Sequence, residues 1–252
     1  MPHEDHIELF KHINFYLSYF DRKSPTILIY DVSSCDQENT AIPCLTSGQN
    51  DLFPTNINCS KKIWNAPLDL LETARNTSNI RLKYIFYYQV LEYYSYYYLE
   101  NSMRRNLKNI INSPDILEFD KYSQKIIEEF RNYSKKYKED ITKLENLVEE
   151  FCTIDDIKIE LENNIDCFIN NTLFDGGFSS ERIAKNRDEL FKQSELLKMI
   201  VRRIDKIRNV LVHARESREN KVISPTSKNS KLLLPYLFLL RRIAEVIAIR
   251  YE

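Results

Sequence analysis

The chain has 252 residues, of which 43% are hydrophobic and 29% are charged, and it contains only 3 glycines. A chain of this length can bury a sizeable core, as one large domain or as two small ones. The scarcity of glycine favours long helices over tight turns. It also excludes the glycine-rich loops that bind phosphates in P-loop ATPases and in dinucleotide-binding folds.

The charges nearly balance, with a formal net charge of −1, but they are unevenly distributed. Basic residues dominate the segment 198–221, whereas residues 139–166 are mainly acidic. A local basic stripe on a neutral protein is typical of a specific polyanion site rather than of general nucleic-acid coating. The 5 cysteines form no Cys-x-x-Cys pair and have no metal-ligand spacing to histidine, so we expect reduced thiols and no metal.

The sequence predicts a small N-terminal α/β appendage covering residues 1–62. Apolar residues recur at helical spacing over 7–20, and the β-branched run 26–32 predicts a strand. A second short strand is expected at 41–45, within a stretch rich in Ser, Asn, Thr and Pro. No basic leader and no apolar run of membrane-spanning length is found, so we expect a cytoplasmic protein.

Residues 63–252 are predicted to form a helical domain. Pro67 suits the start of a helix that ends at Arg75, and a longer helix is expected from Ile80 to Ile111. This longer helix contains half of the chain's 16 tyrosines. A row of tyrosines could stack on unpaired RNA bases, but tyrosines on all sides of one helix are more typical of a core.

A long helical hairpin is predicted as an insertion at about 115–172. Over residues 119–151 apolar side chains stand three or four positions apart throughout, which predicts one heptad-like helix about 50 Å long. The segment 155–171 is expected to return beside it. Such a hairpin would form a dimer arm, bind a partner protein or extend the core.

The rest of the chain is expected to be helical with two breaks. The pair Gly176-Gly177 interrupts the pattern, and Ser180 is expected to cap the helix that follows. A polar loop is expected at 220–230, and a final apolar helix from Lys231 to Tyr251.

The basic segment 202–215 contains the most informative pattern. Asp205, Asn209 and His213 fall at i, i+4 and i+8, so they lie in one row along a helix and neighbouring side chains can hydrogen-bond. Arg208 is one position off this row, and its long planar side chain can reach toward the same cleft. Glu92, on a nearly all-apolar helix, should find a cationic partner or stay exposed, and Arg208 or another basic residue of this segment is a reasonable partner.

The run Arg208-Asn209-Val210-Leu211-Val212-His213 resembles the signature of the HEPN superfamily, in which arginine, a polar residue and about three mostly apolar residues precede histidine. The run Phe86-Tyr87-Tyr88-Gln89-Val90-Leu91-Glu92-Tyr93 also looks like the first bundle helix of defence-associated HEPN proteins. The resemblance covers roughly residues 64–252 and implies an all-helical bundle. Many members of the superfamily are metal-independent ribonucleases of prokaryotic toxin, abortive-infection or CRISPR-linked defence systems.

The resemblance implies two such motifs facing each other across a homodimer, and RNA products with 2',3'-cyclic phosphate and 5'-hydroxyl ends. His213 would be the acid or base, Arg208 would stabilise the phosphorane, and Asn209 would orient His213 or contact the phosphate. Glu92 and Asp205 would support these groups. Flanking phosphates would be bound by the basic residues Arg202, Arg203 and Arg215. No metal or cofactor is expected.

Other functions are compatible with the same residues. His213 could pack at a helix end with Arg208 in a salt bridge, giving a non-catalytic helical interaction module. A regulatory or antitoxin-like subunit would use the heptad seam and the tyrosines to bind another protein, and a nucleotide sensor would bind without cleavage. The expected partners are an RNA substrate, a second copy of the chain, and a cognate antitoxin or other defence-system protein.

Overall fold

The computed structural model of the chain describes residues 2–21, 24–25, 27, 63–98, 101–136, 140–213 and 221–251. In these ranges the protein is mainly helical, as predicted, and the only strands within them are two segments of two residues each. The strands expected at 26–32 and 41–45 lie outside the described residues, apart from Ile27.

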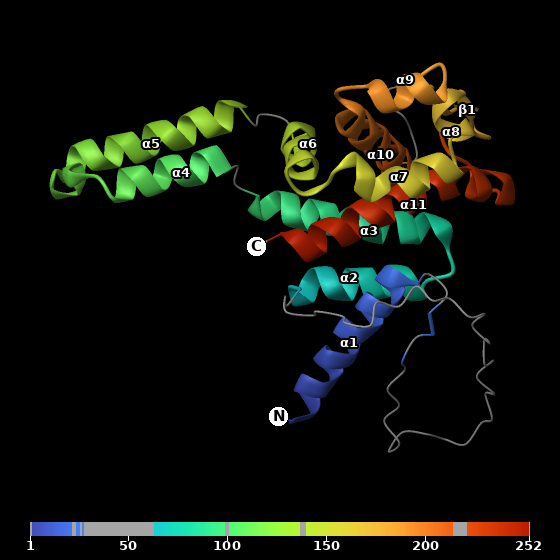
Figure 1. The fold of residues 1–252 in the computed structure, drawn as a ribbon, viewed down its shortest axis with the longest axis horizontal. Helices are drawn as coiled ribbons and strands as arrows, with labels where there is room; N and C mark the ends of the chain where they lie inside the picture. Colours follow the sequence, from blue (N-terminus) through green and yellow to red (C-terminus); the bar gives the residue numbers. More distant parts are fainter. Residues whose placement is uncertain are drawn as a thin grey trace.

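Two helices, α3 (Ile80–Tyr97) and α11 (Ser227–Arg250), lie side by side at the centre of the bundle (Figure 1). On one side, α2 (Asn65–Asn76) packs against α3, and α1 (Pro2–Phe20) packs against α2. On the other side, α6 (Asp140–Phe151) and α10 (Leu196–His213) pack against each other and against α3. The helix α7 (Ile154–Asn163) covers α11.

The boundaries of two helices differ from those predicted. In α2, Pro67 is the third residue rather than the first, a position that tolerates proline because the first-turn N–H groups have no acceptor within the helix. The final helix begins at Ser227, four residues before Lys231, because the Thr226 side chain caps it by accepting the Asn229 N–H at 3.2 Å.

The single helix predicted from Ile80 to Ile111 is wrong. The structure ends α3 at Tyr97 and continues with α4 (Asn101–Ile111), while Tyr98 between them has an extended backbone. Burial of the Tyr98 side chain explains the break, because its hydroxyl donates to Glu150 Oε2 at 2.7 Å on α6. Helical periodicity on both sides of the break conceals it in the sequence.

The predicted helix over residues 119–151 is also two helices, α5 (Phe119–Lys136) and α6. The observed hairpin consists of α4 and α5, joined by the short 3-10 helix η2 (Pro114–Leu117), and it projects from the bundle (Figure 1). It therefore covers 101–136 and not 115–172. The two halves of the heptad seam bury different faces, one against α4 and the other against α10.

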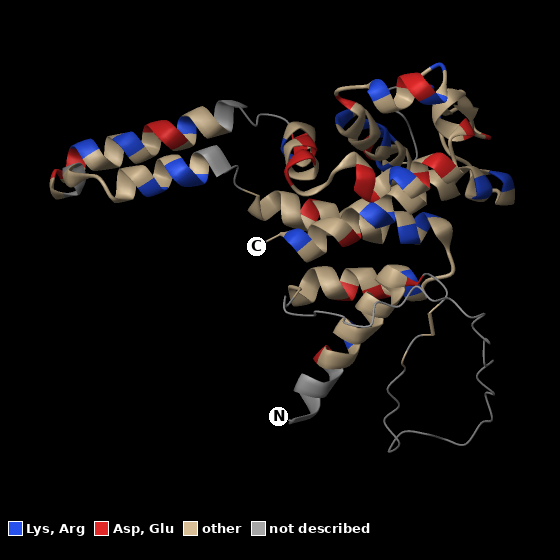
Figure 2. Ribbon diagram, viewed as in Figure 1, with Lys and Arg blue, Asp and Glu red and all other residues tan. Residues whose placement is uncertain are grey.

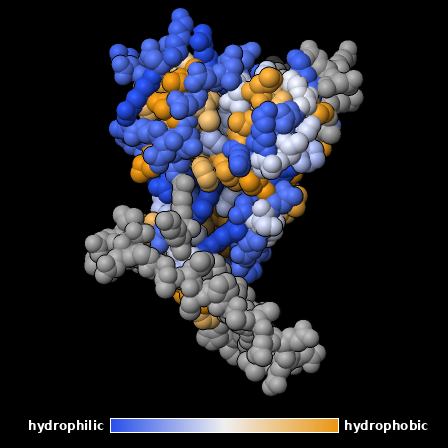
Figure 3. Space-filling model, turned by 90° about the vertical axis from the view of Figure 1, so that its right-hand side faces the viewer, coloured by the Kyte–Doolittle hydropathy of each residue, from blue (hydrophilic) through white to orange (hydrophobic). Residues whose placement is uncertain are grey.

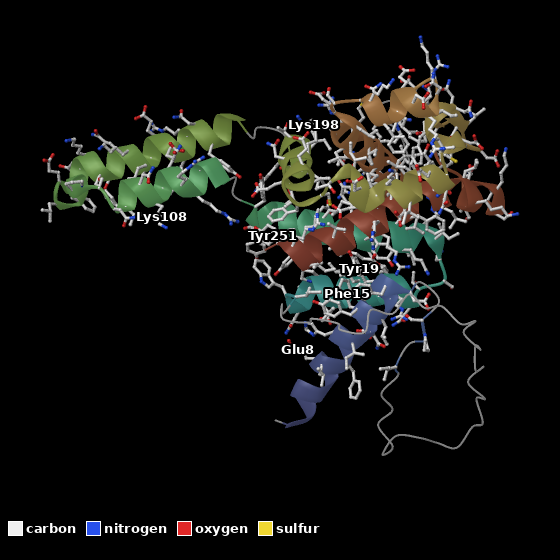
Figure 4. All side chains as sticks on the ribbon, in the orientation of Figure 1. Glu8, Phe15, Tyr19, Lys108, Lys198 and Tyr251 are labelled. Carbon is white, nitrogen blue, oxygen red and sulfur yellow. The ribbon has the colours of Figure 1, made fainter. Side chains whose placement is uncertain are left out.

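The hairpin leaves large apolar side chains exposed. Leu117 is 92% exposed and Phe119 is 76% exposed, near the tip. Helix α5 carries both basic and acidic residues, whereas the charged residues of α4, among them Lys108, are all basic (Figure 2 and Figure 4). A two-helix hairpin has only one helix–helix contact, so its outer faces stay in solvent.

The segment after α7 is irregular where one helix was predicted. A short helix α8 (Asp166–Ile169) leads to an antiparallel pair of strands, β1 (Thr172–Leu173) and β2 (Ser179–Ser180), and then to α9 (Arg187–Lys192). Ser180 is thus in a strand and does not cap a helix. The cap of α9 is Asn186, whose side chain accepts the Glu189 N–H at 2.8 Å.

The predicted glycine break is the turn between the two strands. Gly176 and Gly177 have φ of 107° and 88°, a backbone conformation that L side chains rarely adopt. A Cβ on Gly176 would also lie 2.5 Å from the Val222 carbonyl oxygen. Both conformation and space therefore require glycine at position 176.

The helix predicted over residues 7–20 is confirmed as part of α1, and it belongs to the bundle. Arg241 on α11 donates to the Ser18 carbonyl at 2.9 Å and pairs with Glu245 at 2.5 Å in a largely buried site. The Arg242 guanidinium lies 4.5 Å from the ring centroid of Tyr19, which Figure 4 labels between α1 and the centre of the bundle.

The face at the opposite end from the hairpin is mostly hydrophilic, and its exposed hydrophobic residues form separate patches (Figure 3). Such scattered patches are normal on a folded protein. None of the helices in the described ranges combines the length and the apolar character that crossing a membrane requires.

We predict that Tyr84→Phe destabilises the bundle by about 0.5–1.5 kcal/mol, the usual contribution of one internal hydrogen bond. The Tyr84 side chain is fully buried, and its hydroxyl donates to the Ile204 carbonyl at 3.0 Å, which links α3 to α10. Urea unfolding measures the change in free energy. Tyr96→Phe changes a tyrosine of the same helix that is 76% exposed and is the control. Equal stability of the two variants would contradict the prediction.

Candidate active site

A pocket of about 480 Å³ opens between α3, α6 and α10, beside the base of the hairpin. It is built from the C-terminal halves of α3 and α10 and from the first residues of α6. Its wall includes Tyr88, Glu92, Lys143, Asp205, Arg208 and Asn209. Four of the residues that the sequence singled out, Glu92, Asp205, Arg208 and Asn209, therefore lie together.

These side chains form one hydrogen-bonded chain across the pocket wall. Asp205 accepts from the Tyr88 hydroxyl at 2.6 Å and from the Asn209 amide at 3.0 Å. Arg208 donates to Asn209 Oδ1 at 2.9 Å and forms an ion pair with Glu92. The predicted partnership of Glu92 with Arg208 is confirmed, and so is the Asp205–Asn209 contact.

The spacing of residues on two helices explains this network. Tyr88 and Glu92 are four apart on α3, and Asp205 and Asn209 are four apart on α10, so each pair occupies one helix face. The two faces meet, and the Arg208 guanidinium also lies 5.1 Å from the Tyr88 ring centroid. The Arg208 side chain therefore has three contacts, with Glu92, Asn209 and the Tyr88 ring.

Partial burial shifts the pKa values of three side chains in the pocket wall. Burial raises the pKa of Glu92, and the nearby Arg208 guanidinium only partly opposes this rise. Burial and the hydrogen bond to Asp205 raise the pKa of Tyr88, which keeps its hydroxyl protonated as a donor. Burial lowers the pKa of Lys143, against the opposing effect of Asp140.

His213 occupies a different position from the rest of the signature. It is the last residue of α10, one turn beyond Asn209, and its side chain is exposed. The described residues that line the pocket do not include it. The imidazole is thus on the same helix as the pocket residues but outside the pocket of its own chain.

The structure does not bring the predicted RNA-binding arginines together with Arg208. Arg202 pairs with Glu145 of α6 at 2.5 Å, and Arg203 donates to the Ser180 hydroxyl at 3.0 Å, next to β2. Arg202 is on the same face of α10 as Asn209 but about two turns away from it, whereas Arg203 is on another face. Arg215 lies outside the described residues.

Other pairs beside the pocket keep α6 against α10. Lys198 reaches from α10 to α6 (Figure 4), where it pairs with Glu149 at 3.3 Å. Together with the Arg202–Glu145 pair, this contact fixes two turns of α6, whose first turn contributes Asp140 and Lys143 to the pocket wall.

Sequence analysis missed seven of the residues that line the pocket, and three of them, Tyr88, Lys143 and Tyr96, have polar groups or rings that could act on a ligand. Tyr88 precedes Glu92 by one helical turn, a spacing that could have identified it. Lys143 is in α6, which the heptad pattern joined to α5, and Tyr96 was one tyrosine among eight on a helix. Nothing in their local sequence distinguishes these last two.

Among the described residues, no group of three or more His, Cys, Asp or Glu side chains is placed to hold a metal ion. The chain matches no protein-family model, and neither the curated proteins nor the solved structures contain a significantly similar one. The arguments about function therefore rest on the residues and their geometry.

We predict that Glu92→Gln gains stability relative to the wild type as the pH rises. Because burial raises the folded-state pKa of Glu92 above its ordinary 4.5, the folded protein holds this proton more tightly than the unfolded chain. The wild type therefore loses stability as the pH rises from the unfolded-state pKa of Glu92 through its higher folded-state pKa. The glutamine variant has no proton to lose at this position and lacks this loss.

Urea unfolding at about pH 4 and about pH 7 measures the difference between variant and wild type at each pH. Asp140→Asn removes a more exposed carboxylate from the same pocket and is the control. If Glu92→Gln became relatively less stable with rising pH, attraction to Arg208 would outweigh burial.

Proposed function

We propose that this protein is a metal-independent endoribonuclease in which His213 transfers protons and Arg208 stabilises charge on the reacting phosphate. The main support is the network that holds the Arg208 guanidinium in the wall of an open pocket, on the same helix as an exposed histidine. The resemblance of this helix to the HEPN signature adds to that support. By the same resemblance we assign the protein to a prokaryotic defence or toxin system.

In this mechanism the 2'-hydroxyl of RNA attacks the adjacent phosphorus. A base removes the hydroxyl proton, a pentacoordinate phosphorane forms, and the bond to the 5'-oxygen breaks as an acid protonates that oxygen. The products carry a 2',3'-cyclic phosphate and a 5'-hydroxyl. Histidine suits either proton transfer near neutral pH, and the arginine fork suits two phosphate oxygens at once.

The network gives each pocket residue a role. Glu92 and Asn209 fix the orientation of the Arg208 side chain, which leaves less conformational freedom to lose when a phosphate binds. Asp205, held by Tyr88, fixes Asn209 in turn. These residues are positioning groups, whereas Arg208 and His213 would touch the substrate.

The exposed position of His213 fits a site completed by a second copy of the chain. One imidazole supplies one proton-transfer group, whereas the reaction needs a base and an acid. In a homodimer with the C-terminal ends of α10 facing each other, two histidines and two arginines would surround one phosphate. We therefore propose a homodimer as the active form.

The decisive experiment incubates the wild type and His213→Ala with mixed RNA in excess EDTA and identifies the fragment ends. We expect cyclic-phosphate and 5'-hydroxyl ends from the wild type, and a rate about 10²- to 10⁴-fold lower for the variant, the usual contribution of acid–base catalysis. His12→Ala, which removes a histidine from α1, is the control. Thermal melts should show all three proteins folded.

Two results would reject the ribonuclease proposal. One is cleavage by His213→Ala at the wild-type rate, which would indicate a contaminating nuclease. The other is the absence of cleavage by a folded wild type, whether as monomer or as dimer, across a range of RNA substrates.

The exposed apolar face of the hairpin favours a second function, a non-catalytic module that binds another protein. On α5, Phe119 is 76% exposed, Ile127 49% and Phe130 48%. If this is the function, the His213→Ala variant keeps any toxicity that the wild type shows on overexpression. The double substitution Ile127→Asp with Phe130→Asp abolishes that toxicity. The ribonuclease proposal predicts that His213→Ala abolishes toxicity on overexpression.

A further inference from the structure

A group of aromatic rings is exposed at the end of α3 that adjoins the hairpin. Tyr96 is 76% exposed, Tyr97 48% and Trp64 39%. The three rings are in contact one after another, with centroid distances of 4.9 Å from Tyr96 to Tyr97 and 5.5 Å from Tyr97 to Trp64. Tyr251, labelled in Figure 4 near the chain's C-terminus, contacts Trp64 from the buried side.

The same helix buries most of its other tyrosines, so exposure of these rings is not explained by packing. Tyr84 and Tyr94 on α3, and Tyr98 directly after it, are each no more than 1% exposed and belong to the core. The sequence prediction that the tyrosine-rich helix is mainly structural therefore holds for these residues. It does not account for Tyr96, which is 76% exposed.

Tyr96 also lines the candidate active-site pocket, as does Lys143. The Lys143 ammonium donates to the main-chain carbonyl of Tyr96 at 3.1 Å, which places a cation beside the backbone of this residue. An ammonium has three donors, so it can bind a further acceptor. Tyr96, Lys143 and Arg208 thus border one pocket.

The charge of the pocket wall limits the ligand that it fits. Glu92, Asp140 and Asp205 provide three carboxylates against the two cations Lys143 and Arg208. A wall of this composition repels a ligand that would place several adjacent phosphates in the pocket, such as a nucleoside triphosphate. It suits a unit with one phosphate and a flat base, whose amino groups can donate to the carboxylates.

We propose that Tyr96 is the stacking surface of a nucleotide subsite that takes an unpaired base of single-stranded RNA, with Lys143 binding the adjacent phosphate. This inference rests on the proposed ribonuclease function and specifies its substrate class. Duplex RNA is excluded because its bases are stacked on each other and present no free face. Tyr97 and Trp64 extend the stacking surface away from the pocket for neighbouring bases.

The test measures binding of a fluorescently labelled 2'-O-methyl RNA of about 12 nucleotides, within the usual span of single-strand binding sites. This strand lacks the nucleophilic hydroxyl, so binding to the full chain is read independently of cleavage. The same strand annealed to its complement is the duplex probe. Fluorescence anisotropy gives the dissociation constants.

We expect tighter binding of the single strand than of the duplex, and Tyr96→Ala to weaken single-strand binding by at least about fivefold. Tyr96→Phe keeps the ring and should bind like the wild type. Phe119→Ala, which removes an equally exposed aromatic ring from the hairpin, should also bind like the wild type. Lys143→Gln should weaken binding and reduce its salt dependence.

The inference is overturned if Tyr96→Ala binds like Phe119→Ala, if the duplex binds as tightly as the single strand, or if the folded wild type binds neither probe. Its failure is distinguishable from failure of the ribonuclease proposal. Binding that depends on Tyr96, in a protein that cleaves no RNA, would reject catalysis and retain the subsite. Cleavage that depends on His213 but not on Tyr96 would retain the ribonuclease proposal and reject the Tyr96 subsite.

Discussion

The register of α3 against α10 is the constraint on which the candidate site depends. The buried Tyr84 hydroxyl bonds to a main-chain carbonyl of α10, so the two helices cannot slide past each other without losing a hydrogen bond in the core. One turn further along, Tyr88 meets Asp205, and one turn beyond that, Glu92 meets Arg208. The core contact thus sets the geometry of the pocket.

The charged pair of Arg241 and Glu245 is tolerated inside the bundle because its members satisfy each other. Arg241 pairs with Glu245 on α11 and reaches the Ser18 carbonyl of α1. Burial raises the pKa of Glu92 in the pocket although Arg208 is in contact with it. The Arg241–Glu245 pair of α11 therefore anchors α1, whereas the Glu92–Arg208 pair in the pocket holds charge that a phosphate ligand can engage.

Helical periodicity predicted where the helices are but not where they end. The apolar spacing of Phe130, Ile141 and Leu144 is that of one heptad seam, yet Phe130 belongs to the projecting hairpin and Leu144 to the bundle. A break changes the direction of a helix without changing its apolar spacing. Likewise Tyr98 ends α3 through a hydrogen bond to Glu150, a residue that is distant in sequence.

The sequence by itself determined the contacts within one helix and the need for a charge partner. Asp205 meets Asn209 because a helix brings residues four apart together, and Glu92 was expected to pair with a cation or stay exposed because its helix is apolar. Only the tertiary structure decided that Lys143 and Tyr96 join this pocket. Their positions follow from how α6 and α3 cross α10, and that depends on packing across the whole bundle.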